Sequence, residues 1–82
     1  MSLRERLEAA LAAGQDTALL RFSLGDLLAK SGDLDTACEH LRRAVELDPQ
    51  YSAAWKLLGR TQLRAGYASD ARVTLRQGIA VA

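Results

Sequence analysis

The sequence predicts an all-α protein made of antiparallel helix hairpins that stack side by side. The 82-residue chain is rich in Ala, Leu, Arg and Glu, which lose little side-chain freedom in a helix. No segment alternates apolar and polar residues as a half-buried strand would. The sequence also repeats itself after 34 residues, a period typical of stacked helical hairpins.

The internal repeat relates positions that a close-packed hairpin needs to keep small or apolar. Small residues let two helix backbones approach, and apolar residues fill the seam between them. The pairs brought together by the shift are Leu24 with Leu58, Gly25 with Gly59, Gly32 with Gly66, Ala37 with Ala71, and Leu41 with Leu75. The 82 residues are therefore expected to form a single domain of two repeats and a preceding half repeat.

The N-terminal segment, residues 2–13, is expected to be that half repeat or capping helix. Its apolar residues lie at helical spacing and, shifted by 34, fall on the inward face of a later helix. Gly14 and Asp16 then begin the connection to the next helix. The stripe consists of Leu3, Leu7, Ala10 and Leu11, which fall on Ala37, Leu41, Ala44 and Val45.

The first repeat, residues 18–51, is predicted to contain helices over residues 18–30 and 34–47. Gly32 suits the left-handed position after a helix, and Asp33 or Asp35 is placed to cap the second helix. Pro49 ends it, because proline cannot donate a backbone hydrogen bond. The residues expected to face inward are Leu20, Leu24, Leu27 and Leu28 in the first helix, and Leu34, Ala37, Leu41, Ala44 and Val45 in the second.

The second repeat, residues 52–82, follows the same plan with helices over residues 52–65 and 68–81. Gly66 separates them, and Asp70 lies in the first turn of the last helix, where a negative charge is favourable. The inward residues are expected to be Ala54, Trp55, Leu58 and Leu63, followed by Ala71, Leu75, Ile79 and Val81.

Charge and composition exclude several classes of function. A formal net charge of +1 is too small for a protein that binds nucleic acid by neutralising phosphates, and too balanced for a polybasic membrane module. No stretch approaches the roughly 18 apolar residues of a membrane-spanning helix. A single cysteine, Cys38, excludes an internal disulfide and favours the cytoplasm. Neither Cys38 nor His40 has partners at catalytic or metal-binding spacing, so no enzyme activity, metal or cofactor is expected.

These residues together resemble the tetratricopeptide repeat (TPR) family. The second repeat carries Trp55, Leu58, Gly59 and Ala71 at the spacing of the family pattern, and the first carries Leu24, Gly25, Ala37, Leu41, Ala44 and Pro49. The sequence departs from the pattern at Arg21, Gln62 and Gly78. The resemblance implies a short right-handed solenoid of five helices whose concave face is lined by the first helix of each hairpin.

The resemblance further implies a binding groove for a peptide or protein segment. Phe22 lies off the packed stripe, so it either anchors a ligand or packs on the N-terminal helix. Lys56, Arg60 and Arg64 are four residues apart, so they either bind an acidic peptide or form a solvated face balanced by Asp26. The groove residues implied by the resemblance are Leu19, Phe22, Asp26, Ala29 and Lys30, then Ala53, Lys56, Arg60, Leu63 and Arg64.

Two functions are therefore expected in competition. The first is a protein-interaction scaffold with an unidentified protein or peptide partner, which is acidic if Lys56, Arg60 and Arg64 bind it. The alternative is a self-assembly module without a groove ligand. Because no polar capping helix follows residues 68–81, either the natural chain continues beyond Ala82 or this helix forms a homodimer with a second copy.

Overall fold

The computed structural model describes residues 1–82 and contains five α-helices and no strand. The helices are α1 (Leu3–Ala12), α2 (Ala18–Lys30), α3 (Leu34–Leu47), α4 (Ser52–Arg64) and α5 (Ala68–Val81). The predicted all-α class is confirmed, and the predicted helix bounds agree to about one residue, within the usual uncertainty of helix ends. None of the five helices has both the length and the apolar character needed to cross a bilayer.

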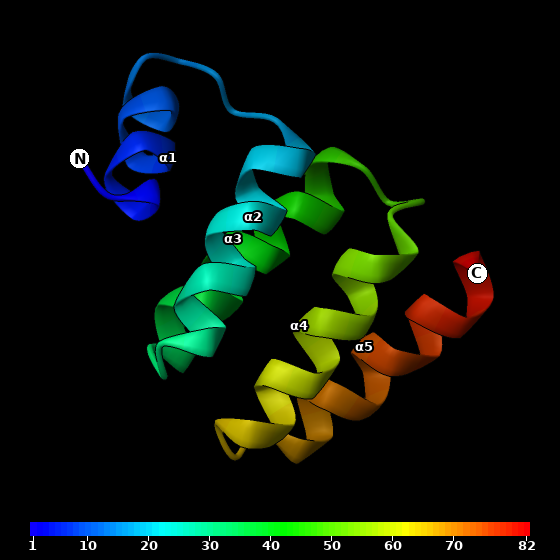
Figure 1. Ribbon diagram of the computed structural model, residues 1–82. Helices are drawn as coiled ribbons and strands as arrows, with labels where there is room; N and C mark the ends of the chain where they lie inside the picture. Colours follow the sequence, from blue (N-terminus) through cyan, green and yellow to red (C-terminus); the bar gives the residue numbers. More distant parts are fainter.

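The helices form two hairpins that lie side by side, with α1 added at one end (Figure 1). Helices α2 and α3 make the first hairpin, α4 and α5 make the second, and α3 packs against α4 between them. Helix α1 contacts α2 alone. The thinnest dimension of the Cα trace is 14 Å, which fits two layers of helices about 8–10 Å apart. The chain is thus a short stack of helix pairs.

Three glycines turn the chain from one helix to the next. Gly14, Gly32 and Gly66 have φ angles of +93°, +88° and +91°, which a residue with a Cβ atom rarely adopts. At these three glycines the helix end is closed by the paired backbone bonds of a Schellman motif. After α2, for example, the Asp33 amide donates to the Leu28 carbonyl at 2.9 Å, and the Gly32 amide donates to the Ala29 carbonyl.

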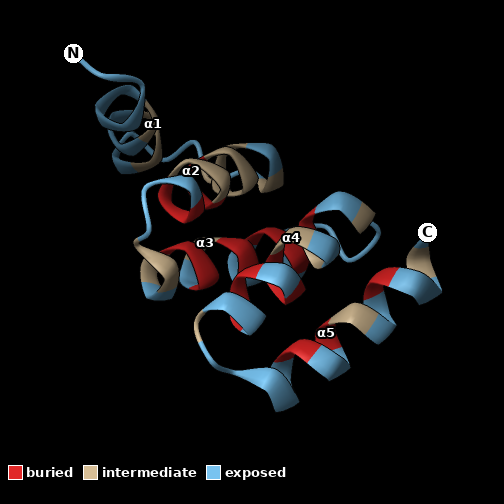
Figure 2. Ribbon diagram, turned by 60° about the horizontal axis from the view of Figure 1, so that its bottom comes forward, coloured by how far each residue is buried: buried red, intermediate tan, exposed pale blue.

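The core lies where the two hairpins face each other (Figure 2). Close approach within each hairpin depends on glycine: a Cβ atom on Gly25 would lie 2.5 Å from Leu41 Cγ. Helix α1, in contrast, contributes no buried residue. The completely buried apolar side chains are Leu24, Ala37, Leu41, Ala44, Ala54 and Ala71, all 0% exposed.

Some of the expectations about individual side chains are wrong. Leu63 and Ile79 were expected inward but are 51% and 75% exposed. Neither side chain is shielded from water by another helix of the structure. Asp33 is the N-cap of α3 but makes no capping hydrogen bond through its side chain. Asp35 does not cap α3; its carboxylate accepts a hydrogen bond from the Tyr67 hydroxyl at 2.7 Å.

Candidate functional site

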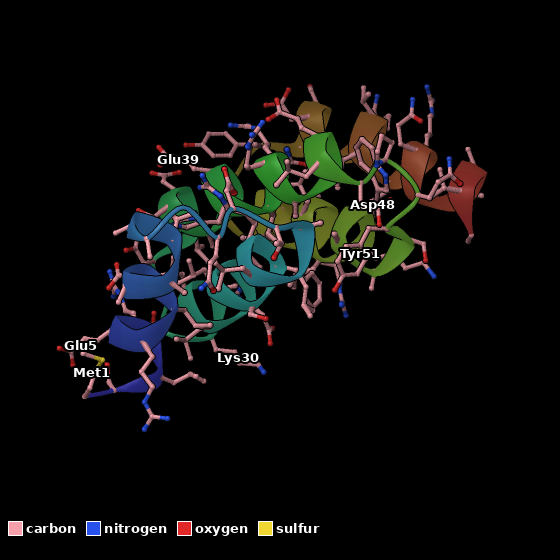
Figure 3. All side chains as sticks on the ribbon, turned by 90° about the horizontal axis from the view of Figure 1, so that it is seen from above. Met1, Glu5, Lys30, Glu39, Asp48 and Tyr51 are labelled. Atoms are coloured by element: carbon pink, nitrogen blue, oxygen red, sulfur yellow. The ribbon has the colours of Figure 1, made fainter.

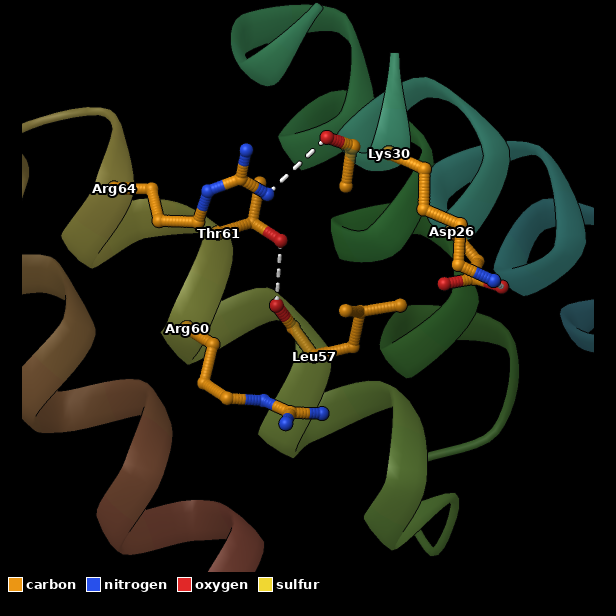
Figure 4. Close-up of a pocket in the computed structure, with 7 residues that line it drawn as sticks. Asp26, Lys30, Leu57, Arg60, Thr61 and Arg64 are labelled. Atoms are coloured by element: carbon orange, nitrogen blue, oxygen red, sulfur yellow. Dashed lines mark hydrogen bonds and ion pairs between the residues drawn. The ribbon is translucent and has the colours of Figure 1, made fainter. Parts of the chain in front are cut away.

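A pocket of about 290 Å³ lies between the first helices of the two hairpins, α2 and α4 (Figure 4). We call it the basic pocket. Its floor is formed by apolar and hydroxyl side chains, and four charged side chains surround it. The lining residues are Asp26, Ala29 and Lys30 from α2 and Leu57, Arg60, Thr61 and Arg64 from α4. Their convergence follows from the fold, because α2 and α4 are equivalent helices of successive repeats.

The charged groups of the basic pocket are only partly paired with one another. Lys30 Nζ lies 3.0 Å from Asp26 Oδ2, one helical turn apart, and both side chains are solvent-exposed. Arg64 Nη1 donates to the Ala29 carbonyl at 3.1 Å, near the C-terminal end of α2, where carbonyls lack helical partners. Arg60 makes no ion pair within the chain. Three cations against one carboxylate leave the pocket positively charged.

A second pocket, of about 300 Å³, lies between α1 and α2. We call it the apolar pocket. Its apolar lining side chains are Leu3 and Leu7 from α1 and Phe22 and Leu27 from α2; Ser23, Asp26 and Lys30 complete it. Asp26 and Lys30 line both pockets, so the two are neighbours on either side of α2. Figure 3 shows Lys30 on the opposite side of the molecule from Glu39.

Phe22 has a mixed role in this arrangement. Its ring stacks on Tyr51 with centroids 5.0 Å apart and an interplanar angle of 29°. It also packs on the main core cluster while lining the apolar pocket. Burial raises the pKa of the Tyr51 phenol, with a smaller contribution from the charge of Asp48. Phe22 is thus held in place by packing and still presents apolar surface to the pocket.

Some of the other predicted groove residues line a pocket and others do not. Asp26, Lys30, Arg60 and Arg64 meet in the basic pocket, as does Ala29. Leu19, at 65% exposed, and Leu63 line neither pocket. Lys56 is displaced from the other two cations: its Cγ lies 3.6 Å from where a Cβ on Gly78 would be, so its stem lies against α5.

Sequence reasoning missed several lining residues. Leu3 and Leu7 were assigned to helix packing, and Leu27 to the buried stripe of α2, yet all three reach the apolar pocket. Leu57 and Thr61 were not considered as groove residues. A signal for the apolar pocket was present in the sequence, because Leu3 and Leu7 belong to an apolar stripe and Phe22 lies off the packed stripe of α2. Leu3 indeed remains 58% exposed.

A network of charged side chains joins the loop after α1 to the first hairpin. Asp16 accepts from Arg21 Nε at 2.7 Å and from Arg43 Nε at 3.3 Å. Arg21 Nη1 donates to His40 Nδ1 at 3.1 Å. The hydrogen bond from Arg21 is the main reason that the pKa of Asp16 is lowered. Burial, followed by the charge of Arg21, lowers the pKa of His40. The network is structural, because it ties three segments together.

The chain shows no cluster of three or more His, Cys, Asp or Glu side chains arranged to hold a metal ion. Cys38 is 2% exposed, and burial is the main cause of its raised pKa. A raised pKa keeps the thiol protonated at neutral pH, whereas the nucleophilic form is the thiolate.

Two stacked hairpins with a pocket between their first helices define the class as a short helical-repeat protein. The model of the family described as "Tetratricopeptide repeat" matches residues 28–82. A TPR repeat-containing protein of Pseudomonas aeruginosa is 53% identical over 78 residues, covering 95% of this chain and 74% of that protein. The solution structure of a Bordetella parapertussis protein is 46% identical with a TM-score of 0.80, covering 99% of this chain and 70% of that one. The chain belongs to the tetratricopeptide repeat family.

Proposed function

We propose that this protein is a protein–protein interaction scaffold that binds a peptide or protein segment in the groove formed by the basic and apolar pockets. TPR domains generally act as scaffolds of this kind. The proposal involves no catalytic step and no cofactor. We also propose that the protein is located in the cytoplasm, because its single cysteine is free.

The observation that carries the proposal is the convergence of Asp26, Lys30, Arg60 and Arg64 around one pocket. Arg60 has no ion pair, and the Asp26–Lys30 pair is solvent-exposed. Exposed pairs of this kind contribute only about 0.2–1 kcal/mol, so Lys30 can exchange its partner for a ligand at little cost. Lys30 and Arg60 thus present positive charge that the fold itself does not need.

The test combines capture of a partner with charge reversal in the groove. The chain would be used to capture partners, and the binding site of a recovered partner mapped by amide chemical shifts. Arg60→Glu is expected to abolish capture. The matched control is Arg72→Glu, an exposed arginine of α5 outside both pockets, which makes the same change in net charge. Equal loss of binding in both variants would refute binding in the groove. Amide shifts confined to the surface around Glu39 of α3, outside both pockets, would also refute it.

The second candidate function is self-assembly through α5, which one internal comparison supports. Val45 of α3 is 6% exposed, while its counterpart in the second repeat, Ile79, is 75% exposed. Val73 adds further apolar surface on α5 at 60% exposed. A second copy covering Ile79 would bury this surface. Light scattering should then show a dimer at low micromolar concentration that Ile79→Asp dissociates. A monomer with α5 fully folded would rule the dimer out.

A further inference from the structure

We infer that the groove recognises an extended segment carrying one apolar side chain and one carboxylate about three residues apart. This inference rests on the proposed function and specifies its partner. It follows from the two pockets being unlike in chemistry yet adjacent. Asp26 and Lys30 belong to both linings, so one bound segment that crosses α2 can reach both.

The apolar pocket selects an aliphatic or aromatic side chain. Four of its lining side chains are apolar, from Leu3, Leu7, Phe22 and Leu27. Leu3 is 58% exposed, so the pocket has apolar surface that the chain leaves in water. Covering such surface is favourable because it removes apolar atoms from water. A pocket of about 300 Å³ has room for one side chain of leucine or phenylalanine size.

The basic pocket selects a carboxylate. Arg60 has all of its guanidinium donors free, and Arg64 uses one of its own to hold the Ala29 carbonyl. Figure 4 shows both arginines projecting from one side of α4 into the pocket, with Asp26 and Lys30 on the far side. A guanidinium presents its donors in a fixed fork that matches a carboxylate, so Arg60 suits an Asp or Glu side chain of the bound segment.

The geometry of the helices sets the separation of the two side chains. One pocket lies between α1 and α2 and the other between α2 and α4, so their centres differ by about one interhelical distance. Packed helices are about 8–10 Å apart, and an extended chain advances about 3.3 Å per residue. The carboxylate is therefore expected about three residues from the apolar side chain.

The test uses amidated synthetic peptides in which Leu and Asp are separated by zero to six Ser or Gly residues. Affinity for the chain should peak when about two residues lie between them. Replacing Asp by Asn should weaken binding about five- to ten-fold, and replacing Leu by Ser about five-fold. A peptide whose only carboxylate is its free C-terminus is a separate arm. If it binds as tightly as the Asp peptide, the assignment to a side chain is wrong.

Matched protein variants separate the two halves of the groove. Arg60→Gln should lose the preference for Asp over Asn, whereas Lys56→Gln, on the same helix but turned toward α5, should keep it. Leu3→Ser should weaken the Leu peptide about three-fold, whereas Leu19→Ser, which is equally exposed but outside both pockets, should not. Equal effects within either pair would overturn the inference.

A random dodecapeptide display library, panned in parallel, distinguishes failure of this inference from failure of the proposed function. Binders that shift groove amides and carry the Leu and Asp pattern support both. Binders that shift groove amides without the pattern overturn the two-part signal and leave the groove function standing. If no enriched peptide shifts an amide of α2 or α4, both are refuted.

Discussion

Gly25 allows Leu41 to lie directly against the backbone of α2. A Cβ atom on Gly25 would be 2.5 Å from Leu41 Cγ and 3.3 Å from the Ala37 carbonyl oxygen. The second repeat reproduces this contact, with Gly59 in the place of Gly25 and Leu75 in the place of Leu41, again at 2.5 Å. The 34-residue period of the sequence is therefore a period of atomic contacts, and it fixes how closely each hairpin closes.

Substituting alanine for the helical glycines should destabilise the fold in a definite order. Alanine gains about 1 kcal/mol of helix propensity over glycine, while overpacking costs about 1–3 kcal/mol. Gly25→Ala should be the most destabilising, because Leu41 is completely buried and cannot move aside. Gly59→Ala should cost less, since Leu75 is half-buried. Gly78→Ala, 3.2 Å from Trp55 Cβ, should be near neutral. Urea unfolding measures all three, and a stabilised Gly25→Ala would contradict the packing.

Replacing Gln62 with leucine should stabilise the protein. Gln62 is 3% exposed, and its Oε1 atom is buried without a hydrogen-bond partner. An unsatisfied buried polar group costs about 1–3 kcal/mol, and the corresponding residue of the first repeat is Leu28, 1% exposed. Gln62→Leu should therefore raise the free energy of unfolding by about 1 kcal/mol.

The control for this substitution is Gln77→Leu, which places the same side chain on the exposed face of α5. It should change the free energy of unfolding by less than about 0.5 kcal/mol, as surface substitutions usually do. Thermal and urea unfolding of both variants would decide. Equal effects at the two positions would show that the unpaired Gln62 Oε1 atom is not the reason for the gain in stability.

The stability of the fold should fall as the pH drops below about 6.5, because of His40. Its lowered pKa means that the unfolded chain takes up the proton at a higher pH than the folded chain does. The stability that neutral His40 contributes is complete above its ordinary pKa. It is lost as the pH falls through the pKa that His40 has in the folded protein. The charged groups that act on His40 are Arg21 of α2, Glu39 of α3, Glu8 of α1 and Asp16 of the connecting loop.

This prediction can be checked by NMR titration of the one histidine and by urea unfolding at several pH values. His40→Gln keeps an acceptor for Arg21 but cannot titrate, so it should flatten the pH dependence between about pH 7 and pH 5. Asp16 does not contribute there, because its pKa is lowered and it stays ionised. If the free energy of unfolding depends on pH as steeply in His40→Gln as in the original protein, another group causes the dependence.

Helix α1 should open more readily than the other four helices. It has no buried residue and contacts α2 alone. Asp16, directly after it, is anchored by Arg21 and Arg43. Asp16→Asn should therefore speed amide hydrogen exchange in α1 by several-fold and leave α4 and α5 unchanged. Glu46→Gln, which removes the exposed ion pair with Arg43 at 3.8 Å, is the control and should have no such effect.

The fold was predictable from sequence because its main determinants are local. Gly14, Gly32 and Gly66 occupy positions that require a positive φ, and Pro49 stops α3, so the helix bounds follow from single residues. The repeat period then identifies equivalent faces. The predictions failed where burial depends on a neighbour rather than on spacing. Val45 is buried in a cluster with Ala54 and Leu58 of α4, whereas Ile79, at the equivalent place on α5, is 75% exposed.

Part of the lining of the basic pocket was predictable for the same reason. Arg60 and Arg64 both line it because they lie one helical turn apart on α4. Lys56 shares their spacing, but its stem packs over Gly78, a contact with α5 that the sequence of α4 does not contain. The apolar pocket was missed because it forms between α1 and α2, and the depth of a pocket between two helices depends on their packing distance.

The α3–α4 contact determines how an array of these units could be lengthened by design. Cys38 lies in that contact at 2% exposed, and Arg72 occupies the matching place on α5. Tandem copies of residues 18–51 would put a small neutral thiol into every new junction. Copies of the second repeat would instead put the larger, charged Arg72 side chain into each junction, beside the place that Asp70 of the next copy would occupy. The first unit therefore offers the smaller and uncharged junction for such an array.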